Sequence, residues 1–431
     1  MHVRYTLPAI DNRVVAPPLR ADHMTKPYKN IHMFKYLGRG VGAVRLLCLA
    51  EVLTMGPVFA FPALLPDFIS LFDFSSTEAG WLSGITFAGY AAAVPTLSAL
   101  TDRLDTRRVY VAGAVVAGLS ALLFAVLAEG FWTALVFRAL AGIGLAGTYM
   151  PGLKALVDRT DGPDQPKWMS WYTASFSLGT GISFLTAGLF AEILGWRGAF
   201  ALLGAGALVA AALVLALDSR IPAAKPIGKL LDLRPVLANR RVMAYVLGYF
   251  AHMWELFGLR SWMVAFLAFA AAGPAFLTPT LVAALSSVVA MIASIGGAAL
   301  ALKYDRIRTC SLFAVASGTC AVLVGLSSGW GMAAVVVLML VYNGVVQLDS
   351  AALTTGAVLA AEPERRGASI AVHSLIGFAG AFLGPLAFGW ILESAGGAQS
   401  ALAWALAFAS LGAVAALGPL ALIGLGRDRA K

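Results

Sequence analysis

The chain has 431 residues, of which 60% are hydrophobic and 12% are charged, and its mean hydropathy is +0.82. An ordinary soluble domain carries roughly 25% charged residues, so this composition excludes a soluble globular protein of this length. The formal net charge is +9, but the basic residues gather at the ends of apolar runs. They therefore indicate membrane topology rather than a nucleic-acid partner. Three cysteines lie in apolar runs and predict no disulfide, namely Cys48, Cys310 and Cys320.

Mainly apolar runs recur along the chain, and each is long enough to cross the roughly 30 Å hydrocarbon layer as a helix. We predict an all-α polytopic membrane protein with twelve transmembrane helices in two pseudo-symmetric halves of six. The predicted spans are residues 43–66, 77–100, 108–128, 131–153, 169–192, 198–218, 242–271, 279–302, 309–328, 331–357, 368–392 and 400–425. The first predicted bundle is residues 43–218 and the second is residues 242–425, joined by a linker at residues 219–241. The predicted N-terminal tail is residues 1–42, and the predicted C-terminal tail is residues 426–431.

The distribution of positive charge predicts the topology. Of the 31 basic residues, 28 lie in the tails, the linker and the loops on one side, and Arg197 alone lies on the other. The remaining two, Arg138 and Arg260, lie inside spans. Positively charged loops stay in the cytoplasm, so we predict cytoplasmic termini and linker, in an inner membrane of the bacterial type.

A charged turn between the second and third spans has a second copy. Asp102-Arg103 is followed by Asp305-Arg306 at a spacing of 203 residues, and Glu51 is followed by Glu255 at a spacing of 204. Matching features in two apolar halves predict a tandem duplication of one bundle. We expect the turns to gate one face through ion pairs, although positive-inside topology alone is an alternative, and the candidate gating residues are Asp102, Arg103, Arg107, Asp305 and Arg306.

These features resemble the major facilitator superfamily, whose loop after the second span reads Gly-x-Leu-Ala-Asp-Arg-x-Gly-Arg-Arg. The residues that match this loop are Leu100, Asp102, Arg103 and Arg107, and those that replace its glycines are Ser98 and Asp105. The residues in the fourth span that resemble the family's Arg-x-x-x-Gly-x-Gly element are Arg138, Gly142 and Gly144. The resemblance implies a secondary transporter whose first, fourth, seventh and tenth spans line a central cavity. Its antiporter branch usually has Gly-Pro in the fifth span, where this chain has Gly181-Ile182.

Ionisable side chains in the predicted spans indicate where transport chemistry occurs. Each costs roughly 2.5–3.5 kcal/mol at the centre of a bilayer, so it must face a wet cavity or a partner. They lie in the first, fourth, seventh and tenth spans and are Glu51, Arg138, Glu255, Arg260 and Asp349. The candidate proton-coupling residues are Glu51, Glu255, Asp349 and His252, with structural ion pairing or packing as the alternative.

Two buried cations and several neutral side chains are candidates for substrate binding, namely Arg138, Arg260, Asn343, Gln347, Trp254 and Tyr249. Guanidinium groups stay charged and bind carboxylates in a forked geometry, which favours an anionic solute. An alternative for Arg138 is a hydrogen bond that locks neighbouring backbone, and an alternative for Arg260 is extension to the membrane interface. His373 receives no role.

The sequence therefore predicts a secondary active transporter of a small organic solute, with H⁺-coupled uptake of an organic anion by alternating access. The alternative is H⁺-coupled efflux of drugs or other amphiphiles. No enzyme is expected, because the Gly-x-Ser-x-Gly match at residues 325–329 lacks the strand–turn–helix context of a hydrolase. We expect no cofactor, metal or nucleic acid. The expected partners are the solute, protons and the lipid bilayer, and the expected state is a monomer.

Overall fold

The computed structural model describes residues 40–220, 233–271 and 277–426. Within these residues the chain forms helices and no strand, which confirms the predicted all-α polytopic class. The α-helices are α2 (Gly40–Met55), α3 (Ala60–Ala63), α4 (Leu65–Phe72), α5 (Ser76–Leu100), α6 (Thr106–Leu127), α7 (Phe131–Val157), α8 (Gln165–Leu215), α9 (Arg234–Ala238), α10 (Arg240–Ala270), α11 (Pro279–Lys303), α12 (Arg306–Leu326), α13 (Met332–Gln347), α14 (Ser350–Ala360), α15 (Arg366–Ser394) and α16 (Ala401–Gly426). Two short 3₁₀ helices are η1 (Ser327–Gly329) and η2 (Pro363–Arg365).

Nine helical segments in the described part of the chain are long and apolar enough to cross a membrane. One of them, α8, contains both the fifth and the sixth predicted span, and Gly195 with a φ of 70° separates the two. Only glycine adopts that backbone conformation without strain, so it sets the turn between the spans. The count of twelve spans and the domain boundaries stay predictions. Most of the predicted N-terminal tail and about half of the linker lie outside the described residues, as does the C-terminal tail beyond residue 426.

The first predicted span is broken between α2 and α3. Pro57 has no N–H to donate, and the helix stops at Met55 and resumes at Ala60. Ser183 of α8 compensates for the break, because its hydroxyl donates to the Gly56 carbonyl and accepts from the Phe59 N–H at 3.2 Å. Irregular backbone at membrane depth is tolerated only where such partners are present.

The tenth predicted span is broken as well, between α13 and α14 at Leu348 and Asp349. Helix α11 approaches this break closely, because a Cβ on Gly297 would collide with the Leu348 carbonyl. Broken membrane helices commonly mark the substrate and ion sites of transporters, because the break frees backbone groups toward a cavity.

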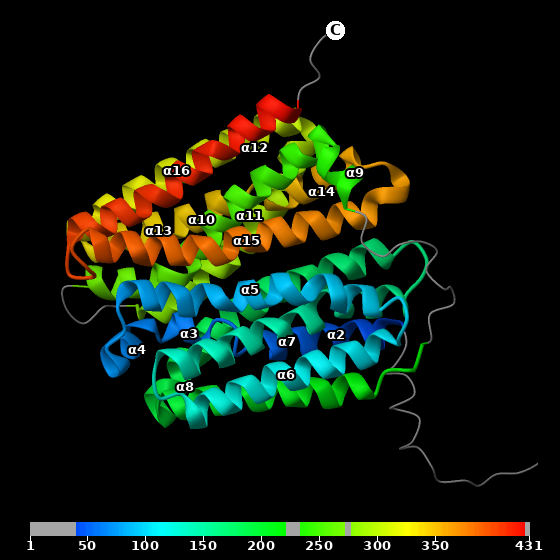
Figure 1. The fold of residues 1–431 in the computed structure, drawn as a ribbon, viewed down its shortest axis with the longest axis horizontal. Helices are drawn as coiled ribbons and strands as arrows, with labels where there is room; N and C mark the ends of the chain where they lie inside the picture. Colours follow the sequence, from blue (N-terminus) through cyan, green and yellow to red (C-terminus); the bar gives the residue numbers. More distant parts are fainter. Residues whose placement is uncertain (1–39, 221–232, 272–276, 427–431) are drawn as a thin grey trace, which may run out of the picture.

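Two layers of helices lie side by side in Figure 1, α2 to α8 in one and α10 to α16 in the other. Across the boundary, α5 packs on α15 and α8 packs on α11. Gly84 permits the first contact, because a Cβ there would collide with the Phe382 carbonyl of α15. Small residues let membrane helices approach in this way.

The contacts between the layers lie toward one end of the molecule. The Thr77 N–H donates to the Glu393 carboxylate at 2.8 Å, and the rings of Phe59 and Phe257 stack with centroids 6.4 Å apart. Thr77 lies in the first turn of α5 and Glu393 lies in the last turn of α15, so this end is opposite the start of α2. The two layers therefore meet at the end that we predict to face outward.

Candidate functional site

Glu51 of α2 is fully buried and is held by a tyrosine from α8. The Tyr172 hydroxyl donates to Glu51 Oε2 at 2.8 Å, and Glu51 Oε1 has no hydrogen-bond partner among the described residues. A Cβ on Gly152 of α7 would collide with the Tyr172 hydroxyl, so the absence of a side chain there makes room for this contact. The carboxylate contacts a neutral donor, and no described cation pairs with it.

Glu255 of α10 has a similar environment in the second layer. Ser317 Oγ of α12 donates to Glu255 Oε2 at 2.9 Å, and the Tyr342 hydroxyl of α13 donates to Oε1 at 3.1 Å. The side chain is buried and forms no ion pair in the described part of the chain. Sequence reasoning identified both glutamates but missed their hydroxyl partners, because Tyr172, Ser317 and Tyr342 are distant in the chain and ordinary in type.

A second polar cluster lies one helical turn from Glu255. His252 Nδ1 is 2.8 Å from Asp349 Oδ1, although the angles are not those of a hydrogen bond, and the pair is ionic only when the imidazole is protonated. The ring of Tyr249 stacks against His252 and also against His373, with centroids 5.6 and 3.9 Å apart. His373 Nε2 lies 3.2 Å from the Thr354 hydroxyl. Sequence reasoning gave His373 no role, yet it joins the cluster of the predicted residues.

Arg138 of α7 contacts backbone. Its Nε donates to the Leu82 carbonyl and its Nη1 to the Val58 carbonyl, both at 3.1 Å, and the guanidinium lies 5.0 Å from the centre of the Phe61 ring. Val58 lies in the break between α2 and α3, so its carbonyl lacks a helical donor. These contacts are the ones expected if Arg138 stabilises neighbouring backbone, which is the alternative to substrate binding.

Arg260 of α10 has no such partners. It is 4% exposed, and its guanidinium lies 5.9 and 5.8 Å from the centres of the Phe59 and Phe257 rings. No described residue forms a hydrogen bond or an ion pair with it. The side chain is buried between the layers and does not extend to the surface.

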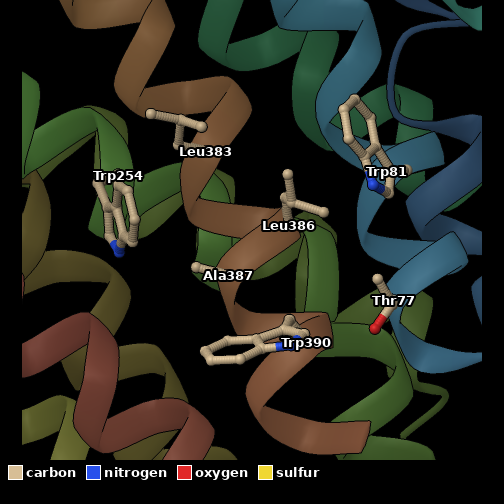
Figure 2. A pocket seen from close by; sticks show the side chains of 7 residues that line it. All are labelled: Thr77, Trp81, Trp254, Leu383, Leu386, Ala387 and Trp390. Carbon is tan, nitrogen blue, oxygen red and sulfur yellow. The ribbon is translucent and has the colours of Figure 1, made fainter.

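The remaining candidates for substrate binding, Asn343, Gln347 and Trp254, do not lie at one common site. Asn343 Nδ2 donates to the Met339 carbonyl within its own helix, and Gln347 Oε1 is buried without a described partner. Trp254 lines an apolar cavity of about 350 Å³ between α5, α10 and α15. Figure 2 shows it beside Leu383 and Ala387 of α15, with Trp81 of α5 on the far side. The cavity is therefore distinct from the polar cluster around Glu255.

The predicted gating residues of the first layer lie on the face at the N-terminal end of α2. Asp102 lies 3.9 Å from Lys154 Nζ, and Arg107 Nη1 donates to the Leu215 and Leu217 carbonyls at 3.2 and 2.8 Å. Arg103 is exposed, and the described residues give it no ion pair. The contacts of this turn join α6 to the ends of α7 and α8 within one layer.

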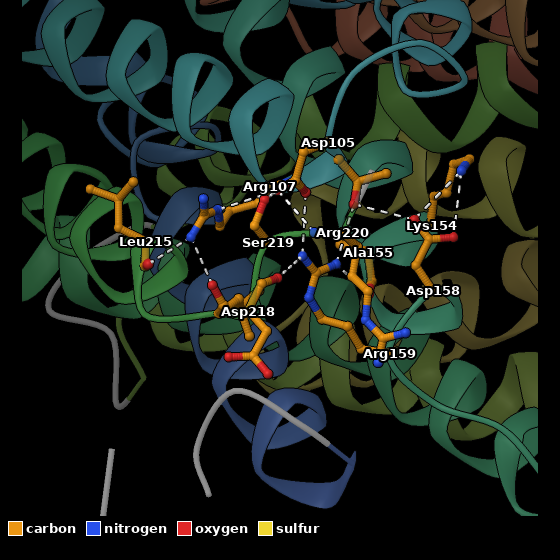
Figure 3. A network of polar contacts seen from close by, with 12 residues as sticks. Asp105, Arg107, Lys154, Ala155, Asp158, Arg159, Leu215, Asp218, Ser219 and Arg220 are labelled. Atoms are coloured by element: carbon orange, nitrogen blue, oxygen red, sulfur yellow. Dashed lines mark hydrogen bonds and ion pairs between the residues drawn. The ribbon is translucent and has the colours of Figure 1, made fainter. Parts of the chain in front are cut away.

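Asp105, which stands in place of a glycine of the family motif, is the centre of these contacts (Figure 3). Its carboxylate accepts from the Arg107 N–H at 3.0 Å, from Ser219 Oγ at 2.8 Å and from the Arg220 N–H at 3.2 Å. Arg159 Nη2 of the loop after α7 lies 3.3 Å from it. Burial raises the pKa of Asp105, but these hydrogen bonds and the charge of Arg159 outweigh it and lower the pKa below its usual range.

Asp305 occupies the same helix-start position in the second layer. It precedes α12 and accepts from the Arg308 N–H at 2.8 Å, as Asp105 precedes α6 and accepts from Arg107. The capping positions therefore pair Asp305 with Asp105 at a spacing of 200 residues. In the predicted repeat Asp305 is matched with Asp102, but Asp102 does not occupy the capping position at the start of α6. Arg306, the other predicted gating residue, lies beside Tyr245 of α10.

Several solved transporters share the fold. A bacterial homologue of the human lysosomal transporter Spinster, inward-facing and unoccupied, superposes with a TM-score of 0.71 at 17% identity, covering 94% of this chain and 96% of that one. The occupied inward-facing form of the same homologue superposes with a TM-score of 0.68 at 18% identity, again covering 94% of this chain and 96% of that one. A variant of the nucleoside transporter NupG superposes with a TM-score of 0.70 at 14% identity, covering 89% of this chain and 100% of that one. At such identities the likeness concerns the fold alone.

Sequence comparison identifies a relative and a family. Human monocarboxylate transporter 11 is 29% identical over 151 residues, which are 32% of this chain and 30% of that protein. The aligned part thus spans less than a third of that relative. The sequence profile of the Major Facilitator Superfamily matches residues 47–361. This match covers well over half of the chain, so the protein belongs to the Major Facilitator Superfamily of membrane transporters.

Proposed function

We propose that the protein is a secondary active transporter that couples uptake of a small organic anion to protons by alternating access. The observation that carries this proposal is the pair of buried glutamates, Glu51 and Glu255, whose described partners are hydroxyl groups only. A buried carboxylate without a cation partner is costly as an anion, and protonation removes that cost. Such a group can bind a proton in one state of the transporter and release it in another.

The polar cluster of α10, α13 and α14 supports the same proposal. His252 and Asp349 lie 2.8 Å apart at the break between α13 and α14, one helical turn from Glu255. An imidazole can accept a proton at one ring nitrogen and donate one from the other, so a histidine beside a carboxylate suits proton exchange. We propose that Glu255 and the His252–Asp349 pair act on the same proton, and that Glu51 acts in the first layer.

An anion is the favoured solute because the two arginines inside the predicted spans have no acidic partner among the described residues. Arg138 and Arg260 both lie inside the molecule, and neither forms an ion pair there. The name of the human relative, monocarboxylate transporter 11, points to the same chemical class. The layers meet at the predicted outer end, which is the arrangement expected of a transporter that opens to the cytoplasm.

The test uses purified protein in liposomes with a pH-sensitive dye inside. An inward gradient of a suitable carboxylate should acidify the lumen, and an inward H⁺ gradient should raise the uptake of the labelled carboxylate several-fold. Empty liposomes report passive leakage of the neutral acid and are the control. Proton movement driven by cationic drugs, with none driven by carboxylates, would instead indicate the efflux alternative.

A further inference from the structure

Arg260 is the buried cation that the proposed function leaves without a specific task. The residue is 4% exposed, and its guanidinium lies over Phe59 and Phe257, 5.9 and 5.8 Å from the centres of the two rings. The described residues supply neither a hydrogen bond nor an ion pair to its donors. Guanidinium carries five N–H groups and stays charged at every physiological pH. The five donors are therefore available to a ligand.

An unpaired buried charge is strongly unfavourable, and structural arginines in membranes normally find carbonyl or carboxylate partners. Ring faces attract a cation only weakly in comparison. The contacts with Phe59 and Phe257 thus leave most of the cost of burial uncompensated. We therefore expect Arg260 to bind an anionic partner during the transport cycle.

Arg138 provides the contrast within the same chain. It too is buried and lies over a phenyl ring, but two of its nitrogens donate to the carbonyls of Val58 and Leu82. Those carbonyls belong to the break after α2 and to α5, so Arg138 stabilises the first layer. Arg138 keeps one nitrogen without a described partner, Nη2, whereas none of the Arg260 nitrogens forms a hydrogen bond in the described part of the chain.

The location of Arg260 suits a substrate contact between the layers. Phe59 comes from the break between α2 and α3, whereas Arg260 and Phe257 come from α10. Phe87 of α5 and Phe378 of α15 extend this aromatic group, with ring centroids 4.2 and 6.1 Å from that of Phe257. A solute held by Arg260 would thus have apolar rings beside it and would contact helices of both layers.

We propose that Arg260 binds the carboxylate of a singly charged organic acid whose apolar body lies against Phe59 and Phe257. This inference rests on the proposed transport of organic anions and names its substrate class. One available guanidinium matches one carboxylate, and a second carboxylate would enter the aromatic surroundings without a partner. The site should therefore prefer monocarboxylates to dicarboxylates and to neutral amides of the same shape.

Binding of three probes that share a benzene ring tests the proposal without any proton gradient. The full-length protein in lipid nanodiscs is titrated at pH 7.5 with benzoate, benzene-1,2-dicarboxylate and benzamide, and heat release is measured. We expect benzoate to bind at least tenfold more tightly than the other two. Arg260→Gln should weaken benzoate binding at least tenfold, whereas Arg260→Lys should retain part of the affinity because it keeps a charge.

The matched control is Arg197→Gln, which removes an exposed arginine that lies over Trp196 in the loop between the fifth and sixth spans. It should leave benzoate affinity unchanged, and melting curves of all variants establish that they are folded. Unchanged benzoate binding in Arg260→Gln overturns the proposal. Equal affinity for the dicarboxylate, or no benzoate binding by the unaltered protein, overturns it as well. Benzoate binding that depends on Arg260 but drives no proton flux would refute the coupling mechanism and leave this site intact.

Discussion

The buried polar residues divide into those that hold the fold and those that are available for transport. Arg138 donates to two carbonyls and Asp105 accepts from three helix or linker donors, so both act within the first layer. Glu51, Glu255 and Arg260 contact only hydroxyls or ring faces. Residue type alone does not make this distinction, because it depends on partners supplied by other helices.

Replacing Arg138 with methionine should destabilise the protein without changing the class of its substrate. The substitution leaves the Val58 carbonyl, which lies in the break after α2, without a donor, and an unsatisfied buried acceptor costs about 1–3 kcal/mol. Thermal unfolding in detergent measures the loss, and Arg138→Lys is the control that retains a donor. A melting temperature equal to that of the unaltered protein would contradict the structural role.

Replacing Asp105 with asparagine should lower the melting temperature by several degrees at pH 7. The pKa of Asp105 is lowered in the folded protein, so its contribution is full above the unfolded value near 4 and disappears as pH falls through the folded value. The difference between Asp105→Asn and the unaltered protein should therefore shrink below about pH 4. Melting curves between pH 3 and 8 measure it, and a difference that does not change with pH would contradict the assignment.

At the scale of helices, the broken first and tenth spans position the chemistry. Pro57 stops α2 and frees the Val58 carbonyl, while the break at Asp349 places that carboxylate against His252. Apolar length predicted that helices form along these runs, since a bilayer imposes that length. It did not predict the breaks, because the Ser183 and Arg138 contacts that permit the first one come from α8 and α7.

The crossing of α5 on α15 offers a test at this scale. Gly84→Val would place a side chain against the Phe382 carbonyl and push the layers apart at the predicted outer end. We expect transport to fall at least tenfold while the protein remains in the membrane. Gly206→Ala in α8 is the matched control, because a Cβ there meets only Leu53 at an ordinary 3.8 Å. Full activity of Gly84→Val would show that this close approach is dispensable.

At the scale of the molecule, hydropathy predicted the polytopic helical class, because that class follows from the membrane as a solvent. The family was predicted from the resemblance of the charged turn and of the Arg138 element. The candidate site was predicted in part. Buried ionisable residues are conspicuous in apolar runs, so Glu51, Glu255 and Arg260 were found, whereas His373 was not. Its place in the polar cluster depends on stacking against Tyr249, which no spacing in the sequence reveals.

The predicted topology can be tested by labelling single cysteines in a variant without Cys48, Cys310 and Cys320. Glu129→Cys lies in an exposed loop on the predicted outer side, and Asp161→Cys lies in an exposed loop on the predicted inner side. An impermeant maleimide should label the first in intact cells and the second only after permeabilisation. The reverse pattern would place the termini outside the cytoplasm.

Proton movement by the unaltered protein and by the Glu51→Gln/Glu255→Gln double variant tests the central claim most directly. Both are reconstituted in liposomes with a pH dye, and carboxylate-driven H⁺ influx is compared with exchange of labelled carboxylate across the membrane. We predict that the double variant loses H⁺ influx at least tenfold and retains exchange, because neutral side chains permit the conformational change without carrying a proton. Undiminished H⁺ influx in the double variant would contradict the account.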